Sequence, residues 1–293
     1  MAWHQIIARL RAQDLPRAEA LLRLTGAAAL AIRDAADDPI VEPAPGTEPL
    51  WPRLEVRALF AHPIDVGRMT ALLGAAVDIE GALALESFAD ADWIDAWRER
   101  LRAREFPNGF WIIPAETPEA AAPARHLRLA MGLAFGTGQH PTTALCLEWL
   151  AAQRLAGEHV LDYGCGSGIL ALAALKLGAA RAWAVDEDPQ ALAATARNAR
   201  LNGLEAALWS GRPEHLPQVA ADVVLANIVA GTLARIAGQF SAWTKPGATI
   251  VLSGLLPEQC ADLEREYARS FEDFRYARDG DWVRLVARRK SLR

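Results

Sequence analysis

The chain has 293 residues, of which 52% are hydrophobic and 23% charged, so it has the composition of a globular protein with one large or two ordinary domains. Residues 1–90 hold 8 basic and 13 acidic side chains and so account for the whole net charge of −5. An acidic front segment argues against direct nucleic-acid binding. It is compatible with a basic protein partner, or with charge that serves only solubility.

The sequence also argues against a membrane-spanning protein, a secreted protein and a disulfide-rich or zinc-binding protein. No apolar run approaches the roughly 18 residues of a transmembrane helix, and the N-terminus lacks the pattern of a signal peptide. The three cysteines, Cys146, Cys165 and Cys260, show no CxxC spacing. They predict neither a disulfide framework nor a zinc site, and favour a reducing, cytoplasmic location.

Residues 1–90 are predicted to form a small domain with the element order β-α-β-β-α-β, which is typical of ferredoxin-like folds. Asp14 is the expected cap of the first helix, and Gly26 ends that helix. A proline-rich loop separates the second and third strands. The expected strands are 3–10, 27–34, 50–60 and 82–90, and the expected helices are 14–24 and 64–75.

Residues 91–124 are predicted to link this domain to the next. Residues 91–107 favour a helix that ends at Pro107, with Trp93 and Trp97 on one face, where they either anchor the helix or meet a substrate. The following segment, 109–126, predicts a strand, then a loop rich in proline and alanine that suits a hinge.

Residues 125–293 alternate between strands and helices, which predicts a doubly wound, mostly parallel sheet with helices on both faces. A terminal hairpin is expected to add an antiparallel edge strand. The expected strands are 159–164, 181–186, 206–211, 222–227, 248–254, 271–280 and 281–289. The expected helices are 142–152, 168–178, 188–203, 231–243 and 257–270. Ligands of such sheets bind at the carboxyl ends of the strands.

The segment "VLDYGCGSG" predicts a ligand site at the first of these ends. Gly164, Gly166 and Gly168 form a tight GxGxG turn, Asp162 stands two residues before it, and Asp186 ends the next strand. An acid at that strand end is placed to hold ribose hydroxyls. The spacing favours S-adenosylmethionine over NAD or FAD, and a purely structural turn is the remaining alternative.

Asn227 ends the strand in "DVVLANIVAG" and is expected to face the same crevice. By itself it could simply cap the next helix. Beside a methyl donor, its carbonyl could instead orient a substrate amine. The Pro-Pro-aromatic sequence that often follows such an asparagine is replaced here by Ile228 and Val229.

The stretch "MGLAFGTGQHPTTALC", residues 131–146, predicts the start of a helix at Pro141 after a glycine-rich loop. It lacks the lysine of a phosphate-binding loop, a second metal ligand near His140, and the GxSxG of a serine hydrolase. His140 remains a minor candidate for a general base.

Together with "VDEDPQAL" and "NARLNG", these motifs make the chain resemble the ribosomal protein L-eleven methyltransferase family over nearly its whole length. The resemblance implies a seven-stranded class I methyltransferase domain of Rossmann-like fold. It also implies transfer of methyl groups from S-adenosylmethionine to lysine side chains and the α-amine of a ribosomal protein of the large subunit. No metal is expected.

The resemblance also assigns roles to single residues. Cofactor contacts fall on Thr143, Gly164, Asp186 and Asn227, with Gly166, Asp162 and the loop residues Phe135, Gly136 and Thr137 beside them; Asn227 would also position the amine. Ala130 and Met131 replace the family's common acid-proline pair, and Ala115 replaces a common tryptophan. Residues 1–90 would recognise the substrate.

Two other functions remain open from the sequence. One is a methyltransferase of the same fold that acts on a release-factor glutamine, on rRNA or on a small molecule. The other is a non-catalytic ribosome-assembly module with a decayed cofactor site, which the intact glycines and acids at the strand ends argue against.

Overall fold

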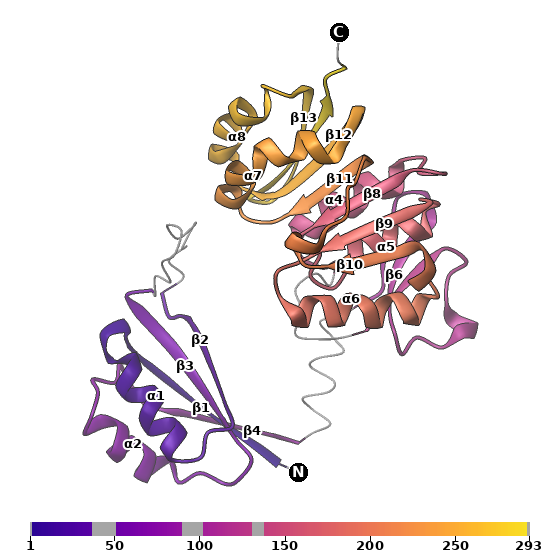
Figure 1. Cartoon of the computed structure of the whole chain (residues 1–293). Helices are drawn as coiled ribbons and strands as arrows, with labels where there is room; N and C mark the ends of the chain where they lie inside the picture. The colour runs from indigo at the N-terminus through magenta and orange to yellow at the C-terminus, as the bar shows by residue number, and fades with distance from the viewer. Residues whose placement is uncertain (1, 37–50, 90–101, 131–137, 292–293) are drawn as a thin grey trace. The chain divides into compact units, whose positions relative to one another are not determined.

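The computed structural model describes residues 2–36, 51–89, 102–130 and 138–291 of the chain (Figure 1). These residues belong to two compact units, Met1–Glu99 and Arg100–Arg293. None of the helices in the described ranges is long and apolar enough to cross a membrane.

The first unit is an antiparallel four-stranded sheet with two helices. Its strands follow the order β2-β3-β1-β4, and its elements follow the order β-α-β-β-α-β, as the sequence predicted. The strands are β1 (Ala2–Arg11), β2 (Ala29–Asp34), β3 (Arg53–Phe60) and β4 (Ala84–Ala89). The helices are α1 (Leu15–Leu24) and α2 (Val66–Gly74).

Alternation along β3 builds the core of this unit, because every second side chain from Leu54 to Phe60 is buried. Asp65 caps α2 by accepting a hydrogen bond from the backbone N–H of Arg68. The cap predicted for α1 is wrong. Asp14 holds the N-cap position, but its side chain makes no capping bond because it is the last residue of a short 3₁₀ turn and already has a helical conformation.

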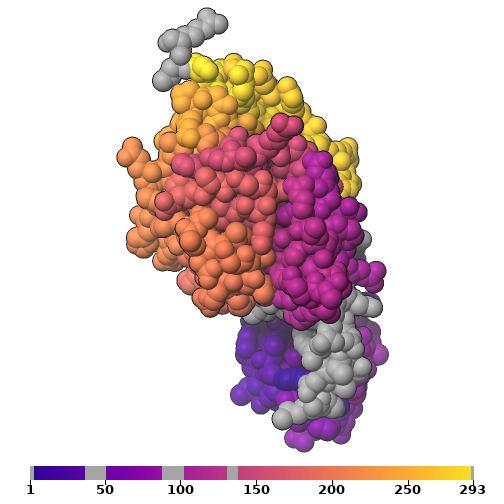
Figure 2. Space-filling model, turned by 90° about the vertical axis from the view of Figure 1, so that its right-hand side faces the viewer, coloured from indigo at the N-terminus to yellow at the C-terminus, as the bar shows by residue number. Residues whose placement is uncertain are grey.

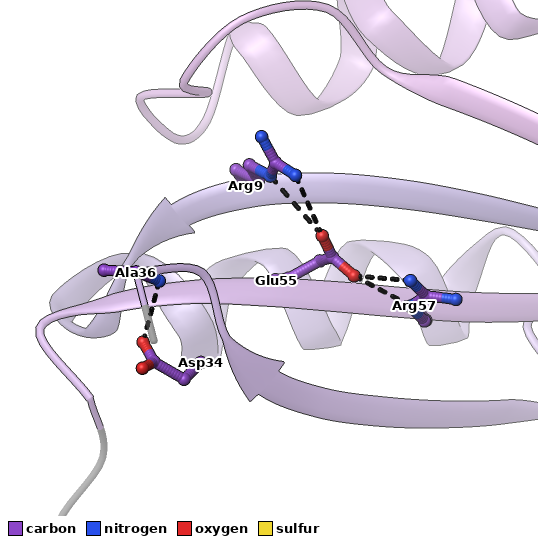
Figure 3. Close-up of polar contacts among 5 residues, drawn as sticks. All are labelled: Arg9, Asp34, Ala36, Glu55 and Arg57. Atoms are coloured by element: carbon purple, nitrogen blue, oxygen red, sulfur yellow. Dashed lines mark hydrogen bonds and ion pairs between the residues drawn. The ribbon is translucent and has the colours of Figure 1, made fainter. Parts of the chain in front are cut away.

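The other face of this sheet carries a charged cluster (Figure 3). Glu55 on β3 accepts hydrogen bonds from Arg9 on β1 and from Arg57 on its own strand. The Arg57 guanidinium is the main cause of the lowered pKa of Glu55. Asp34 turns the chain after β2 by accepting from the N–H of Ala36. The Arg9–Glu55 pair links β1 to β3 on the side opposite the core.

The predicted helix over 91–107 is wrong at its end, and residues 90–101, with Trp93 and Trp97, lie outside the described residues. Residues 104–106 are instead a strand, β5 (Arg104–Phe106), paired with β6 (Phe110–Pro114), which pairs with β7 (His126–Leu129). Phe106, Phe110 and Ile112 enter the hydrophobic core of the second unit. Burial of these side chains overrides the helix propensity of the arginine-rich segment.

From Arg104 onward the predicted linker and hinge segment is therefore packed on the second unit. In Figure 2 the magenta surface of this segment lies against the pink-to-orange surface of the rest of the second unit.

The second unit is built on a seven-stranded sheet of order β10-β9-β8-β11-β12-β14-β13. Its parallel strands are β8 (His159–Tyr163), β9 (Arg181–Val185), β10 (Leu208–Gly211), β11 (Ala221–Asn227) and β12 (Thr244–Leu255). Strand order reverses beside β8, so the crevice between β8 and β11 is the switch point at which such folds bind ligands.

Helices cover both faces of this sheet (Figure 1). Helices α4 (Pro141–Ala152), α5 (Ile169–Lys176) and α6 (Pro189–Asn202) share one hydrophobic core with β5–β7. Helices α7 (Ala230–Trp243) and α8 (Cys260–Tyr267) share the other core, on the opposite face. The predicted doubly wound architecture is confirmed.

The terminal hairpin differs from its prediction in one respect. Strand β14 (Trp282–Arg289) is antiparallel to both β12 and β13 (Phe271–Asp279) and lies between them. The antiparallel strand is thus inside the sheet, and the edge strand β13 runs parallel to β12. Burial of Val283, Leu285 and Ala287 explains why β14 takes the inner position.

Candidate active site

A cavity of about 570 Å³ opens at the carboxyl ends of the central strands, in the second unit. Four of the residues predicted from the sequence line it: Gly164, Gly166, Asp186 and Asn227. They lie up to 63 positions apart in the chain, and the parallel sheet brings them to one edge. Further lining residues come from neighbouring strand ends and helices: His140, Thr142, Tyr163, Glu187, Pro213, Ile228, Val229, Thr232, Arg235, Gly254 and Trp282.

The glycine turn after β8 forms part of the cavity wall. Gly164, Gly166 and Gly168 have φ angles of 76°, 54° and 78°, in the left-handed region that favours glycine. A Cβ added at Gly164 would overlap the Cγ2 methyl of Ile228, so a side chain there would be both strained and blocked. The turn therefore leaves the backbone open to close approach by a ligand.

Asp186 stands beside this turn at the end of β9. Its Oδ2 accepts a hydrogen bond from the Gly166 N–H at 2.9 Å, and its Oδ1 accepts one from the Asp188 N–H at 3.0 Å. These bonds fix the carboxylate at the cavity wall. Each carboxylate oxygen keeps a further lone pair, which a ligand hydroxyl can use.

Asp162 does not line the cavity and is only 1% exposed. Its Oδ2 accepts a hydrogen bond from the Ala171 N–H at 3.0 Å, in the first turn of α5, whose N-cap Gly168 has no side chain to offer. The carboxylate thus serves as the cap of α5 from β8. Burial, only partly offset by this hydrogen bond, raises the pKa of Asp162 to about 7.

Thr143 is buried behind the residues that line the cavity. It is in the first turn of α4, is 1% exposed and does not line the cavity. The Nδ2 of Asn227 donates a hydrogen bond to its Oγ1 at 3.0 Å. Thr143 thus lies in the helix predicted over residues 142–152, and its contact with the cofactor stays a prediction.

His140 caps α4 and lines the cavity. Its Nδ1 lies 2.8 Å from the Thr142 hydroxyl and accepts from the Thr142 N–H, and its ring meets the Trp282 ring edge-on at 5.2 Å between centroids. Burial lowers its pKa, so the ring is neutral near pH 7. An Nδ1 used as a helix cap is a poor candidate for a general base.

Sequence reasoning missed several lining residues. Gly254 lies near the end of β12, at the same sheet edge, and its position could have been inferred from the strand prediction. Trp282 comes from the hairpin of β13 and β14, and no local signal marks it. Phe135, Gly136, Thr137 and Met131 lie outside the described residues. The Ala130 N–H donates to the side-chain Oδ1 of Asn198, and the Ala115 N–H donates to the Leu129 carbonyl.

The cavity fits an adenosyl cofactor on observations of the chain itself. Gly164 and Gly166 present backbone without side chains at the cavity wall, Asp186 provides an acceptor for a hydroxyl pair, and carboxylates of Asp186 and Glu187 favour a ligand with positive charge. Among the described residues, no group of histidine, cysteine and carboxylate side chains is arranged to hold a metal ion.

Fold and site together define a methyltransferase of Rossmann-like fold that uses S-adenosylmethionine. The family described as ribosomal protein L11 methyltransferase (PrmA) matches residues 2–290. The chain belongs to this family, as its motifs indicated.

Individual relatives agree with this assignment. Proteins named ribosomal protein L11 methyltransferase from Pseudomonas aeruginosa (strain LESB58) and from Pseudomonas putida are each 43% identical to the chain over 296 residues, covering 99% of it and all of theirs. The crystal structure of ribosomal protein L11 methylase from Lactobacillus delbrueckii subsp. bulgaricus is 30% identical, with a TM-score of 0.58, and covers 64% of this chain and 99% of its own.

Proposed function

We propose that the chain transfers methyl groups from S-adenosylmethionine to lysine ε-amines and to the α-amine of ribosomal protein L11. One observation carries the proposal beyond the family match: Gly164, Asp186 and Asn227 line a single cavity at the switch point of the sheet. The residues proposed to hold the cofactor and the Asn227 amide that would orient the amine thus face the same cavity.

Gly164 and Gly166 would hold the methionine part of the cofactor, and Asp186 its ribose hydroxyls. The bound cofactor supplies a methyl group on a positively charged sulfur. Asn227 would accept a hydrogen bond from the substrate amine through Oδ1, since its Nδ2 already donates to Thr143. This bond directs the nitrogen lone pair toward the methyl group. The protein's contribution is positioning and exclusion of water.

The amine must be neutral to act as a nucleophile. An α-amine with a pKa near 8 needs little help, whereas a lysine with a pKa of ~10.4 costs about 4 kcal/mol to deprotonate near pH 7.5. A largely apolar cavity beside a sulfonium charge lowers that cost. No dedicated base is required, and the capping role of His140 agrees with its not being one.

We propose further that residues 1–90 recognise the ribosomal protein and that the enzyme works in the cytoplasm on the free or ribosome-bound substrate, without binding nucleic acid directly. The ferredoxin-like unit supports this division because it is a compact unit with its own hydrophobic core. Removing residues 1–90 should leave cofactor binding intact and abolish methylation of L11. Unchanged methylation by the truncated chain would contradict the recognition role.

The proposed function is tested with labelled S-adenosylmethionine and three acceptors in parallel: unmethylated L11, a peptide-chain release factor and rRNA fragments. Mass spectrometry of the products should show added methyl groups on amines of L11 alone. Transfer to a release-factor glutamine or to rRNA would favour the other methyltransferase function, and absence of transfer to all three would favour a non-catalytic module.

A further inference from the structure

Two asparagines of α6 pair with the main chain at β7, the last strand of the three-stranded sheet β5-β6-β7. The Asn202 side chain accepts from the Arg128 N–H at 2.9 Å and donates to the Arg128 carbonyl at 2.7 Å. The Asn198 Oδ1 accepts from the Ala130 N–H at 2.9 Å. Residues four apart on a helix lie about 6 Å apart along its axis, close to the ~6.6 Å between alternate residues of a strand. The spacing of the two asparagines therefore matches the edge of β7.

Asn198 makes a second hydrogen bond, to the glycine turn after β8. Its Nδ2 donates to the Ser167 carbonyl at 2.9 Å. Three residues earlier on α6, the Thr195 hydroxyl donates to the Gly166 carbonyl at 3.0 Å. Both α6 side chains are fully buried, whereas Gly166 lines the cavity. Two successive peptide carbonyls of the turn are thus held by α6.

A single buried amide therefore joins the glycine turn to the end of β7. Its oxygen is used as an acceptor by Ala130, and its NH₂ group is used as a donor to Ser167. A buried polar group that loses its partner is costly, so a shift of either segment is opposed by the bond to the other.

We propose that Asn198 is a positioning residue of the cofactor site, through which the glycine turn and β7 stabilise each other. A cofactor bound against the turn then strengthens the bond between Asn198 and Ala130, and loss of Asn198 weakens cofactor binding, because coupling between two sites is reciprocal. The inference rests on the proposed placement of the cofactor against Gly164 and Gly166. The hold of Asn198 on the turn does not depend on that placement.

The test compares Asn198→Ala with Asn202→Ala, its matched control. Each substitution removes an asparagine of α6 that bonds to the main chain at β7, and of the two it is Asn198 that also bonds to the turn. Calorimetry gives the Kd of S-adenosylmethionine, thermal unfolding gives the stability, and hydrogen exchange followed by NMR gives the opening rates of single backbone amides.

We expect Asn198→Ala to raise the Kd about 10-fold, a size usual for coupling between two sites. It should also speed exchange of the Gly166 N–H, although the acceptor of that N–H, Asp186, is unchanged. Asn202→Ala should lower stability but leave Gly166 exchange unchanged and the Kd within about twofold of the parent. In the parent, saturating cofactor should slow exchange of the Ala130 N–H more than that of the Arg128 N–H, which bonds to Asn202.

Asn198→Asp tests the bond to the turn separately, and it replaces the alanine variant if that variant does not fold. Its carboxylate keeps an acceptor for the Ala130 N–H but cannot donate to the Ser167 carbonyl, whereas its protonated form can. Burial raises the pKa of such a carboxyl, so the Kd of the variant divided by that of the parent should fall between about pH 8 and about pH 6. The ratio removes the effects of Asp162 and Asp186, the acids beside the turn that both proteins share.

An unchanged Kd in Asn198→Ala, or an equal rise in Asn202→Ala, would overturn the inference, because Asn198 would then serve stability alone. Exchange of the Gly166 N–H at the parental rate would overturn the hold on the turn. If the cofactor leaves the Gly164 and Gly166 NMR signals of the parent unshifted, the proposed placement of the cofactor is wrong instead. Gly166 exchange in the absence of cofactor then still decides whether Asn198 holds the turn.

Discussion

Gly164, Gly166 and Asp186 form one wall of the cavity through backbone conformation and short-range hydrogen bonds, whereas Asn227 on the other wall is held by a side chain 84 positions away. The first wall is complete within β8, β9 and the turns that follow them. The second exists only when α4 packs against the end of β11. The contrast suggests that cofactor binding and amine positioning are separable, and that substitutions should affect one without the other.

The largest effect on the cofactor wall is expected for Gly164→Ala. The added methyl would overlap Ile228, and the φ of 76° disfavours alanine by a further 1–2 kcal/mol or so. We expect the Kd of S-adenosylmethionine to rise roughly 100-fold, measured by calorimetry.

Gly203→Ala is the control, because Gly203 has a similar φ of 66° but open space around it. It should cost stability alone and leave the Kd unchanged. Equal effects of the two substitutions on the Kd would show that backbone strain, and not the overlap with Ile228, causes the loss of affinity.

Asp186→Ala should have the next largest effect. Loss of the acceptor for the ribose hydroxyls is expected to raise the Kd of S-adenosylmethionine at least about 10-fold, since a hydrogen bond to a charged group contributes about 1.5–3 kcal/mol. An unaltered Kd would contradict the ribose role. Asp222→Ala is a useful comparison, because Asp222 also accepts a backbone hydrogen bond, from His159, but does not line the cavity.

The smallest effect on the cofactor site is expected from Asp162, whose substitution should change stability and not affinity. Its pKa is raised from 3.8 to about 7, so the folded state binds a proton more tightly than the unfolded state. This contribution to stability is fully present below pH ~4 and is lost as pH rises through about 7. Asp162→Asn keeps an acceptor for the Ala171 N–H but cannot titrate. The parent should therefore lose about 1–4 kcal/mol of its free energy of unfolding between acid pH and pH above 7 that the variant does not lose.

Denaturant unfolding between pH 4 and pH 8 measures this difference. A parent and variant with parallel pH profiles would show that Asp162 does not titrate in this range. Because Asp162 caps α5 and does not line the cavity, the variant should bind S-adenosylmethionine normally at pH 7 if it folds.

Local pattern in the sequence predicted that Gly164, Gly166 and Asp186 lie together, because a glycine turn after a strand and an acid at the next strand end occupy fixed places in a parallel sheet. It could not predict that Asp162 turns inward to cap α5, or that Thr143 meets Asn227, since both depend on packing between distant elements. The same limit explains β14, whose place between β12 and β13 is decided by burial of alternate side chains. It also explains β5, where Phe106 enters the core.

Single-turnover transfer to L11, followed as a function of S-adenosylmethionine concentration in Asn227→Ala and Asp186→Ala, tests the separation of the two walls most directly. We predict that Asp186→Ala regains the parental rate when the cofactor is saturating, whereas Asn227→Ala stays about 100-fold slow at every concentration. If Asn227→Ala also recovered at saturation, its role would be cofactor binding alone, and the account of two separate walls would be wrong.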